Sequence, residues 1–256
     1  MRGQSQMDLA LAAGVSTRHV SYLETGKARP SREMVAVLTK AMDLPLRARN
    51  QLLAAAGFAP LYTETPMDGL TLGPVRDALQ FVLQAMEPNP TFIVNRCYDV
   101  VDANAAGRWV LATFTADAGK CAAPVNMAQL VMRPEGMRGF IRNLEEVQRK
   151  VLGRLRRDLG SAHVREQRDD ELLMEIDPVL KALGEPRLPV ETLPLISGLN
   201  LKRDSIELNL FTTIATIGTA QDVTLQEMRI ETLFPADAAT RTVLAERPPL
   251  ASRLAG

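Results

Sequence analysis

Residues 12–31 read AAGVSTRHVSYLETGKARPS, and this stretch decides the fold of the N-terminal part of the chain. Gly14 follows an apolar segment, and a glycine tolerates the positive φ that a tight turn requires. Ser16 stands where it can cap a second helix, and Gly26 stands where that helix would end. Pro30 and Ser31 then restart the chain. The pattern predicts one helix over 6–13, a tight turn, and a second short helix over 16–25.

Two further helical segments are bounded by the same kinds of cap and stop residues. One covers 31–42, with Ser31 as its N-cap, and the other covers 46–56 and ends at Gly57. The next residues are rich in turn formers and lack periodicity. We therefore expect an all-α domain over 1–57 and a linker over 58–71.

The second helix has the composition of a DNA-reading helix. Val20 and Leu23 form its buried stripe, while Thr17, Arg18, Ser21 and Tyr22 lie on the opposite face. In a helix-turn-helix the second helix enters the major groove, where an arginine can make a bidentate contact to guanine. Lys27 and Arg29 follow in the loop, where phosphates would lie.

Local charge supports DNA binding. Residues 1–57 carry eight basic and four acidic side chains, whereas the whole chain of 256 residues has a net charge of zero. A zero total excludes a generally basic nucleic-acid coat but leaves room for a basic patch. The alternative from the residues alone is a small helical bundle with a solvated charged face.

The stretch SQMDLALAAGVSTRHVSYLETGKARPS resembles the XRE/Cro repressor helix-turn-helix family. The resemblance implies that Gln6 lies near phosphate and that the exposed face of the second helix contacts bases. The family has a further helix before this motif, which Met1–Gln4 are too few to form, so we expect Leu9, Val20 and Leu38 to be partly exposed. The expected DNA-binding residues are Gln6, Ser16, Thr17, Arg18, Ser21, Tyr22, Lys27 and Arg29.

From residue 72 the pattern changes to mixed α and β. Helical periodicity covers 75–86, 104–114, 139–160 and 169–183, the last kinked or restarted at Pro178. Strand-like runs cover 91–94, 98–104, 193–201, 204–218 and 222–234. The last three predict an antiparallel meander with turns at 202–204 and 219–222. The fold class is therefore α+β, a small all-α domain followed by an antiparallel-sheet domain with flanking helices over 72–247.

The stretch GPVRDALQFVLQAMEPNPTFIVNRCYDVVDANAAGRWVLATF is similar to the MmyB-like regulators, which join an XRE domain to a PAS-like ligand-binding domain. The resemblance implies a cavity between the sheet and its helices. An ordinary filled core is the alternative. The residues expected to line the cavity are Phe92, Val94, Trp109, Phe114, Phe140, Phe211, Ile214, Met228 and Ile230.

The same residues suggest an acyl chain or a similar apolar ligand, since no paired buried charge is evident in the strands. The carboxylate of such a ligand would need a cation, for which Arg96, Arg108 and Arg138 are the candidates.

Several classes of function find no support in the sequence. It contains no HExxH, CxxC, P-loop or GxGxxG motif, and its two histidines and two cysteines form no catalytic or metal-binding pattern. No apolar run is long enough to cross a membrane, and no signal peptide is evident. We therefore expect neither an enzyme, nor a metal site, nor a cofactor, nor a membrane partner. The two cysteines suit the reducing cytoplasm.

These observations together predict a cytoplasmic, homodimeric transcription regulator. It would bind a double-stranded DNA operator and would be controlled by a small apolar ligand, possibly fatty acid-like. The alternative is a regulator whose C-terminal domain has no small-molecule site and serves only for dimerisation or partner docking.

Overall fold

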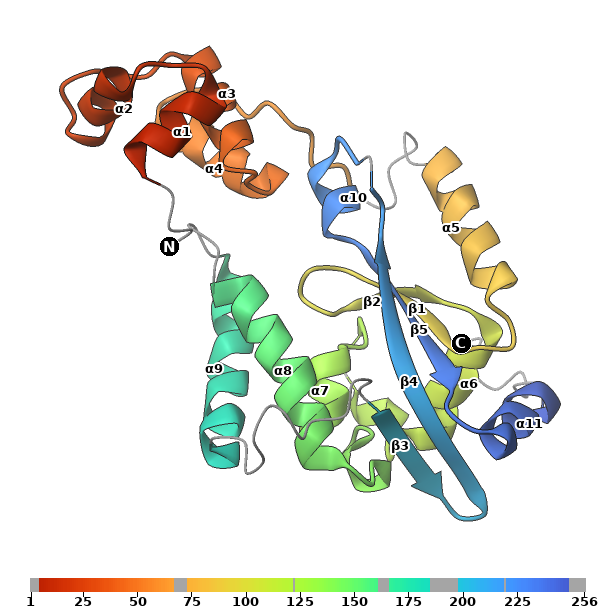
Figure 1. Cartoon of the computed structure of the whole chain (residues 1–256). Helices are drawn as coiled ribbons and strands as arrows, with labels where there is room; N and C mark the ends of the chain where they lie inside the picture. Colours follow the sequence, from red (N-terminus) through yellow and green to blue (C-terminus); the bar gives the residue numbers. More distant parts are fainter. Residues whose placement is uncertain are drawn as a thin grey trace. The chain divides into compact units, whose positions relative to one another are not determined.

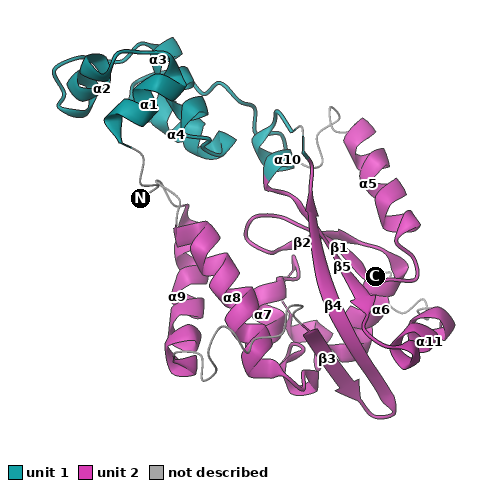
Figure 2. Ribbon diagram, in the orientation of Figure 1, with its two compact units in different colours: residues 1–66, 218–226 teal, residues 67–217, 227–256 magenta. Residues whose placement is uncertain are grey.

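The computed structural model describes residues 5–66, 73–121, 123–160, 166–184, 198–218 and 220–248. The chain forms two compact units. Unit 1 comprises residues 1–66 together with 218–226, and unit 2 comprises 67–217 and 227–256 (Figure 2). Each unit has its own core.

Unit 1 contains four short helices in its first 66 residues: α1 (Gln6–Ala13), α2 (Thr17–Glu24), α3 (Arg32–Ala41) and α4 (Leu46–Ala55) (Figure 1). Serine hydroxyls begin three of them, because Ser5, Ser16 and Ser31 each accept a hydrogen bond from a backbone N–H in the first turn. Gly14 ends α1 with φ of 66°. The four helices predicted from the sequence are confirmed.

A small apolar core holds these helices together. It is built on Ala10, Val20 and Val35, with Leu46 and Leu53 from α4. The expected exposure of Val20 is wrong, since only 2% of it is exposed. Leu9 and Leu38 are half-buried. The apolar side chains that α1 leaves open to solvent are instead those of Met7 and Leu11.

Unit 2 is built on a five-stranded antiparallel sheet in the order β2-β1-β5-β4-β3. Its strands are β1 (Thr91–Val94), β2 (Val100–Ala103), β3 (Gly198–Arg203), β4 (Ile206–Thr216) and β5 (Arg229–Pro235). Strands β3, β4 and β5 follow one another as neighbours, which confirms the predicted meander and the α+β class. Residues 193–197 of the first predicted strand of the meander lie outside the described residues.

Helices surround this sheet: α5 (Gly73–Ala85), α6 (Ala105–Phe114), α7 (Met127–Met132), α8 (Leu144–Gly160), α9 (Gln167–Leu183) and α11 (Ala238–Glu246) (Figure 1). The main core joins one sheet face, with Phe92, Leu208 and Leu210, to apolar side chains of α6 to α9. Helix α9 runs on through Pro178 without interruption.

Two predicted elements differ from the structure. The helix expected over 139–160 is replaced at its start by a 3₁₀ turn (Arg138–Phe140), because Ile141 pairs with Leu201 at the sheet, and α8 begins only at Leu144. The strand expected over 222–234 begins with a helix, α10 (Val223–Glu227), and only its second half is β5. Asp222 starts α10 by accepting a hydrogen bond from the N–H of Leu225.

Candidate DNA-reading helix and ligand cavity

Two cations, Arg18 of α2 and Lys27 of the loop after it, lie close to the ring of Tyr22. The Nε of Arg18 donates to the hydroxyl of Tyr22 at 2.9 Å, and the guanidinium lies 5.2 Å from the ring centroid. The Nζ of Lys27 lies 5.9 Å from the same centroid. Both cations are exposed. Tyr22 thus brings together two positive charges, one on α2 and one in the loop after it, among the residues that the sequence predicts to contact DNA.

The other predicted DNA-binding residues lie around this cluster in sequence. The amide of Gln6 donates to the carboxylate of Glu24, so in this structure it joins the start of α1 to the end of α2. Ser16 accepts from the N–H of His19 as the cap of α2. Thr17 and Arg29 are exposed, whereas Ser21 is half-buried.

Unit 2 contains a cavity of about 410 Å³. This volume lies within the range of small-molecule sites, roughly 300–1,000 Å³. Its walls come from β1, β3, β4 and β5 on one side and from α6, α7 and α8 on the other. The apolar lining residues are Phe92, Val110, Leu111, Met127, Leu130, Val131, Met137, Ile141, Val147, Val151, Leu199, Phe211 and Leu233.

Three polar lining residues form one corner of the cavity, which we call the polar corner: Tyr98, Arg154 and Glu231. Nη1 of Arg154 lies 3.3 Å from the hydroxyl of Tyr98 and 3.4 Å from Oε1 of Glu231. Glu231 is only 8% exposed. Burial raises the pKa of its carboxyl, while the nearby Arg154 and Arg229 oppose that rise. The expectation that the strands hold no paired buried charge is therefore wrong.

A second cation lies on the same helix as Arg154. Lys150 also lines the cavity, one helical turn earlier on α8, and its Nζ forms an ion pair with Glu146. Thr212 and Thr213 of β4 complete the polar part of the lining. The cavity is thus mostly apolar, with two cations and one carboxylate among its few polar groups.

The residues predicted from the sequence to line the cavity divide into two groups. Phe92 and Phe211 line it. Val94, Trp109 and Phe114 are buried in the main core, where the two aromatic rings meet edge to face at 6.5 Å. The remaining four lie elsewhere: Phe140 under the guanidinium of Arg203, Met228 buried, Ile230 half-buried and Ile214 37% exposed.

The arginines considered for a ligand carboxylate do not line the cavity. Arg96 binds the buried Asp169 at 2.9 Å, Arg108 binds Asp102 at 2.9 Å, and Arg138 donates to a backbone carbonyl. Lys150 and Arg154 are the cations that do line it, and sequence reasoning missed them because helical periodicity over 139–160 does not show that these two positions face a cavity. A signal for Glu231 was present, since strand alternation places it on the same face as Leu233.

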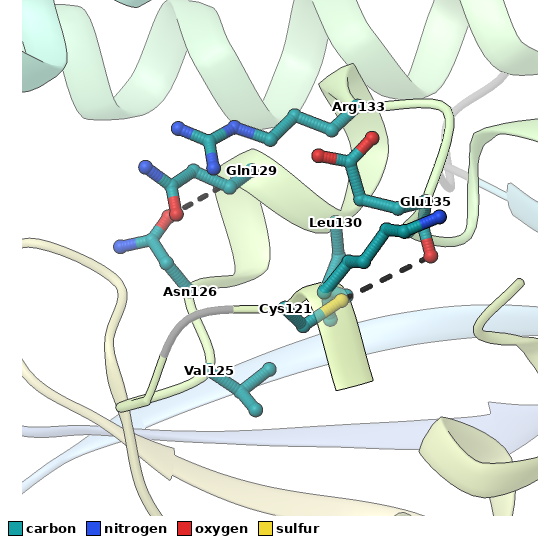
Figure 3. Close-up of a pocket in the computed structure, with 9 residues that line it drawn as sticks. Cys121, Val125, Asn126, Gln129, Leu130, Arg133 and Glu135 are labelled. Atoms are coloured by element: carbon teal, nitrogen blue, oxygen red, sulfur yellow. Dashed lines mark hydrogen bonds between the residues drawn. The ribbon is translucent and has the colours of Figure 1, made fainter. Parts of the chain in front are cut away.

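A second pocket lies beside α7 and is lined by Cys121, Asn126, Gln129, Arg133 and Glu135, among others (Figure 3). Its volume is about 10 Å³, close to the space of a single water molecule. Two of its side chains are already engaged, because Arg133 and Gln129 bind the carboxylate of Glu175. The pocket is too small to hold an organic ligand.

The described residues contain no group of three or more histidine, cysteine or acidic side chains that could hold a metal ion. In the same part of the chain, no helix is both long and apolar enough to cross a membrane.

Comparison with known proteins places both units in described families. Residues 2–48 match the model of a helix-turn-helix family, and residues 75–246 match the model of the MmyB-like transcription regulator ligand binding domain. A search of curated proteins found no match to the chain. Both families are of the regulator type and not of an enzyme type. Because the second model covers well over half of the chain, this protein belongs to the MmyB-like transcription regulators, DNA-binding proteins that carry a ligand-binding domain.

Proposed function

We propose that the protein is a one-component regulator that acts in the cytoplasm as a homodimer and reads its operator with the exposed face of α2. A small apolar ligand in the unit 2 cavity would control this binding. The observation that carries the proposal is the cavity itself, about 410 Å³ of space lined mainly by aliphatic and aromatic side chains. A regulator without a small-molecule site would be expected to fill this space with side chains.

An acyl chain with an acidic head group fits the chemistry of the lining. The aliphatic walls suit the chain, and Lys150 and Arg154 are cations that a head group could reach without leaving the cavity. The raised pKa of Glu231 favours its protonated form, which would repel a second carboxylate less than an ionised one does. The polar corner therefore supports an acid more than the apolar lining alone would.

The test is a chain-length series of straight-chain acids from C6 to C16, titrated into the full chain by calorimetry. Each buried methylene contributes roughly 0.8 kcal/mol, so affinity should rise about fourfold per methylene until the cavity is full. Thermal unfolding measured in parallel should shift upward with the same order of ligands.

Two variants serve as test and control. Val151→Trp places a large side chain in the cavity wall and should abolish binding. Met174→Trp adds the same indole on α9 at a position that is 70% exposed and outside the lining, so it should bind as the wild type does. If affinity is independent of chain length, or no acid raises stability, the alternative of a dimerisation or docking module takes the place of this proposal.

A further inference from the structure

The connection between β4 and β5 belongs to unit 1, although both strands belong to unit 2. We call this connection, Gly218–Gln226, the anchor segment. In Figure 2 it carries the colour of the helix-turn-helix helices. It also lies inside the stretch that matches the ligand-binding family model, residues 75–246. The anchor segment therefore belongs to the ligand-binding domain in the family match, but it packs as part of the unit that contains the helix-turn-helix.

Asp222 makes the first set of bonds that hold the anchor segment. Its Oδ2 accepts from the hydroxyl of Thr63 at 2.9 Å and from the N–H and hydroxyl of Thr65 at 3.0 and 2.8 Å. The N–H of the neighbouring Val223 donates to the carbonyl of Thr63 at 2.8 Å. Asp222 is 8% exposed and Val223 is fully buried. The carboxylate of Asp222 is therefore largely buried, and its Oδ2 has hydrogen-bond partners.

Gln226 makes the second contact, and it is directly with a helix. Its Oε1 accepts from the backbone N–H of Leu46 at 2.7 Å. Leu46 is the first residue of α4, and the residue in the N-cap position, Pro45, makes no side-chain capping bond. Gln226 thus caps α4 from 180 positions away in the sequence. A helix is commonly capped by a residue next to it in the sequence. Because Gln226 takes this role for α4, the start of α4 depends on the anchor segment.

The same helix also holds the linker that receives Asp222. The side chain of Asn50 accepts from the N–H groups of Leu61 and Tyr62 and donates to the carbonyl of Tyr62. Arg47 forms an ion pair with Glu64. Helix α4, residues 58–66 of the linker and the anchor segment therefore form one continuous hydrogen-bonded assembly within unit 1.

A few residues away from the anchor segment, the two strands that carry it line the cavity. On β4, Phe211 to Thr213 are lining residues, and Thr213 precedes Gly218 by five positions. On β5, Glu231 and Leu233 are lining residues, and Glu231 follows Gln226 by five positions. Paired strands move as a unit because their hydrogen-bonded register resists slippage.

We propose that the anchor segment is the device that couples the state of the cavity to the DNA-binding unit, with Asp222 and Gln226 as its two attachment points. A shift of β4 and β5 is delivered to the start of α4 through these bonds. The coupling itself is a property of the chain, while its use in ligand control rests on the proposed function. A ligand changes DNA affinity only as far as it binds the two arrangements differently, and a coupling of about 5–150-fold is typical.

The first experiment measures this coupling in the full chain with dodecanoic acid as the probe. Operator affinity is measured with and without saturating acid in the wild type and in Asp222→Ala, Gln226→Ala and Gln221→Ala. The last is the matched control, since Gln221 lies in the same segment but is exposed. We expect the two anchor variants to bind the acid normally and to lose the acid-dependent change in operator affinity, while Gln221→Ala keeps it. An undiminished change in both anchor variants would overturn the proposal.

The second experiment needs no ligand. Leu233→Ala alters the cavity wall on β5, and hydrogen exchange then reports on the backbone amides of Leu46–Ala55. We expect this substitution to change the exchange of α4 in the wild-type background but not in the Gln226→Ala background, with circular dichroism as the check of folding. Equal α4 exchange with and without Leu233→Ala would refute the coupling. If the coupling is present but no acid binds, the ligand proposal fails alone. If acid controls DNA binding in the anchor variants as well, the coupling fails alone.

Discussion

Tyr22 restricts the side chain of Arg18 on the exposed face of α2. Its hydroxyl accepts a hydrogen bond from Nε of Arg18, and the cationic groups of Arg18 and Lys27 lie 5.2 and 5.9 Å from its ring centroid. A long arginine loses considerable rotamer entropy when it binds DNA, and a partner that already restricts it lowers that cost. Arg18 and Lys27 differ in what they can recognise, because a guanidinium suits a bidentate base contact and an ammonium acts as a point charge on phosphate.

This difference predicts two kinds of loss. Arg18→Ala should weaken operator binding by about 1–3 kcal/mol and relax the preference at one base pair. Lys27→Ala should weaken operator and random DNA alike and should reduce the salt slope of log K by about one. Fluorescence anisotropy at several salt concentrations measures both. Lys120→Ala in unit 2 is the charge-matched control and should change neither. An equal loss on operator and random DNA for Arg18→Ala would contradict its role as a base reader.

Two of the buried carboxylates, Asp222 and Glu231, show how the environment of a carboxyl group decides the direction of its pKa shift. Burial acts to raise the pKa of Asp222, but hydrogen bonds from Thr65 and Thr63 outweigh it and the pKa is lowered. For Glu231 burial dominates and the pKa is raised. The hydrogen bonds of Asp222 favour its charged form, and the burial of Glu231 disfavours the charged form of its carboxyl.

At the scale of elements, the contact of α6 with β1 depends on a residue without a side chain. A Cβ on Gly107 would lie 2.9 Å from the carbonyl oxygen of Thr91 and 3.0 Å from a ring carbon of Phe92. Asn104 joins the same two elements, because its Oδ1 accepts from the N–H groups of both Thr91 and Gly107. Helix α6 therefore sits against the strand that supplies Phe92 to the cavity.

This close approach predicts that a glycine-to-alanine substitution has opposite effects on stability at two helical positions. Gly107→Ala should destabilise the protein by about 1–3 kcal/mol, since the added methyl meets backbone. Gly153→Ala in α8 meets nothing within 4 Å and should stabilise it by roughly 0.4–1 kcal/mol, because alanine restricts the unfolded chain. Urea denaturation of the two variants and the wild type compares them directly. A neutral or stabilising Gly107→Ala would show that α6 can move away from β1 at little cost.

At the scale of the whole molecule, the proposed homodimer determines the form of the operator. Two copies of α2 related by a two-fold axis would enter successive major grooves on one side of the duplex. We therefore expect a roughly palindromic operator whose half-sites lie about 10 base pairs, or a multiple of that distance, apart. Footprinting combined with mass measurement of the complex tests this. Binding of one copy to a single asymmetric half-site would contradict the dimer.

The sequence by itself determined the elements whose signals are local. Ser5, Ser16 and Ser31 cap their helices through bonds that span three residues, so these helices could be placed from neighbouring letters alone. Strand β1 followed from a short run of strand-forming residues, and β3, β4 and the second half of the predicted last strand followed from strand-like runs separated by turn residues. The face of α2 that carries Arg18 and Tyr22 also followed from helical periodicity, because both residues belong to one short helix.

Only the tertiary structure decided which distant residues share a site. Arg154 and Glu231 meet at the cavity from α8 and β5, and Gln226 caps α4 although 180 positions separate it from Leu46. Nothing in the local pattern of either partner indicates such a pair, because the energy of the contact arises only when packing brings both groups out of water together. For the same reason residues 223–227, which alternate like a strand, form α10, where the bonds of Asp222 outweigh the local preference.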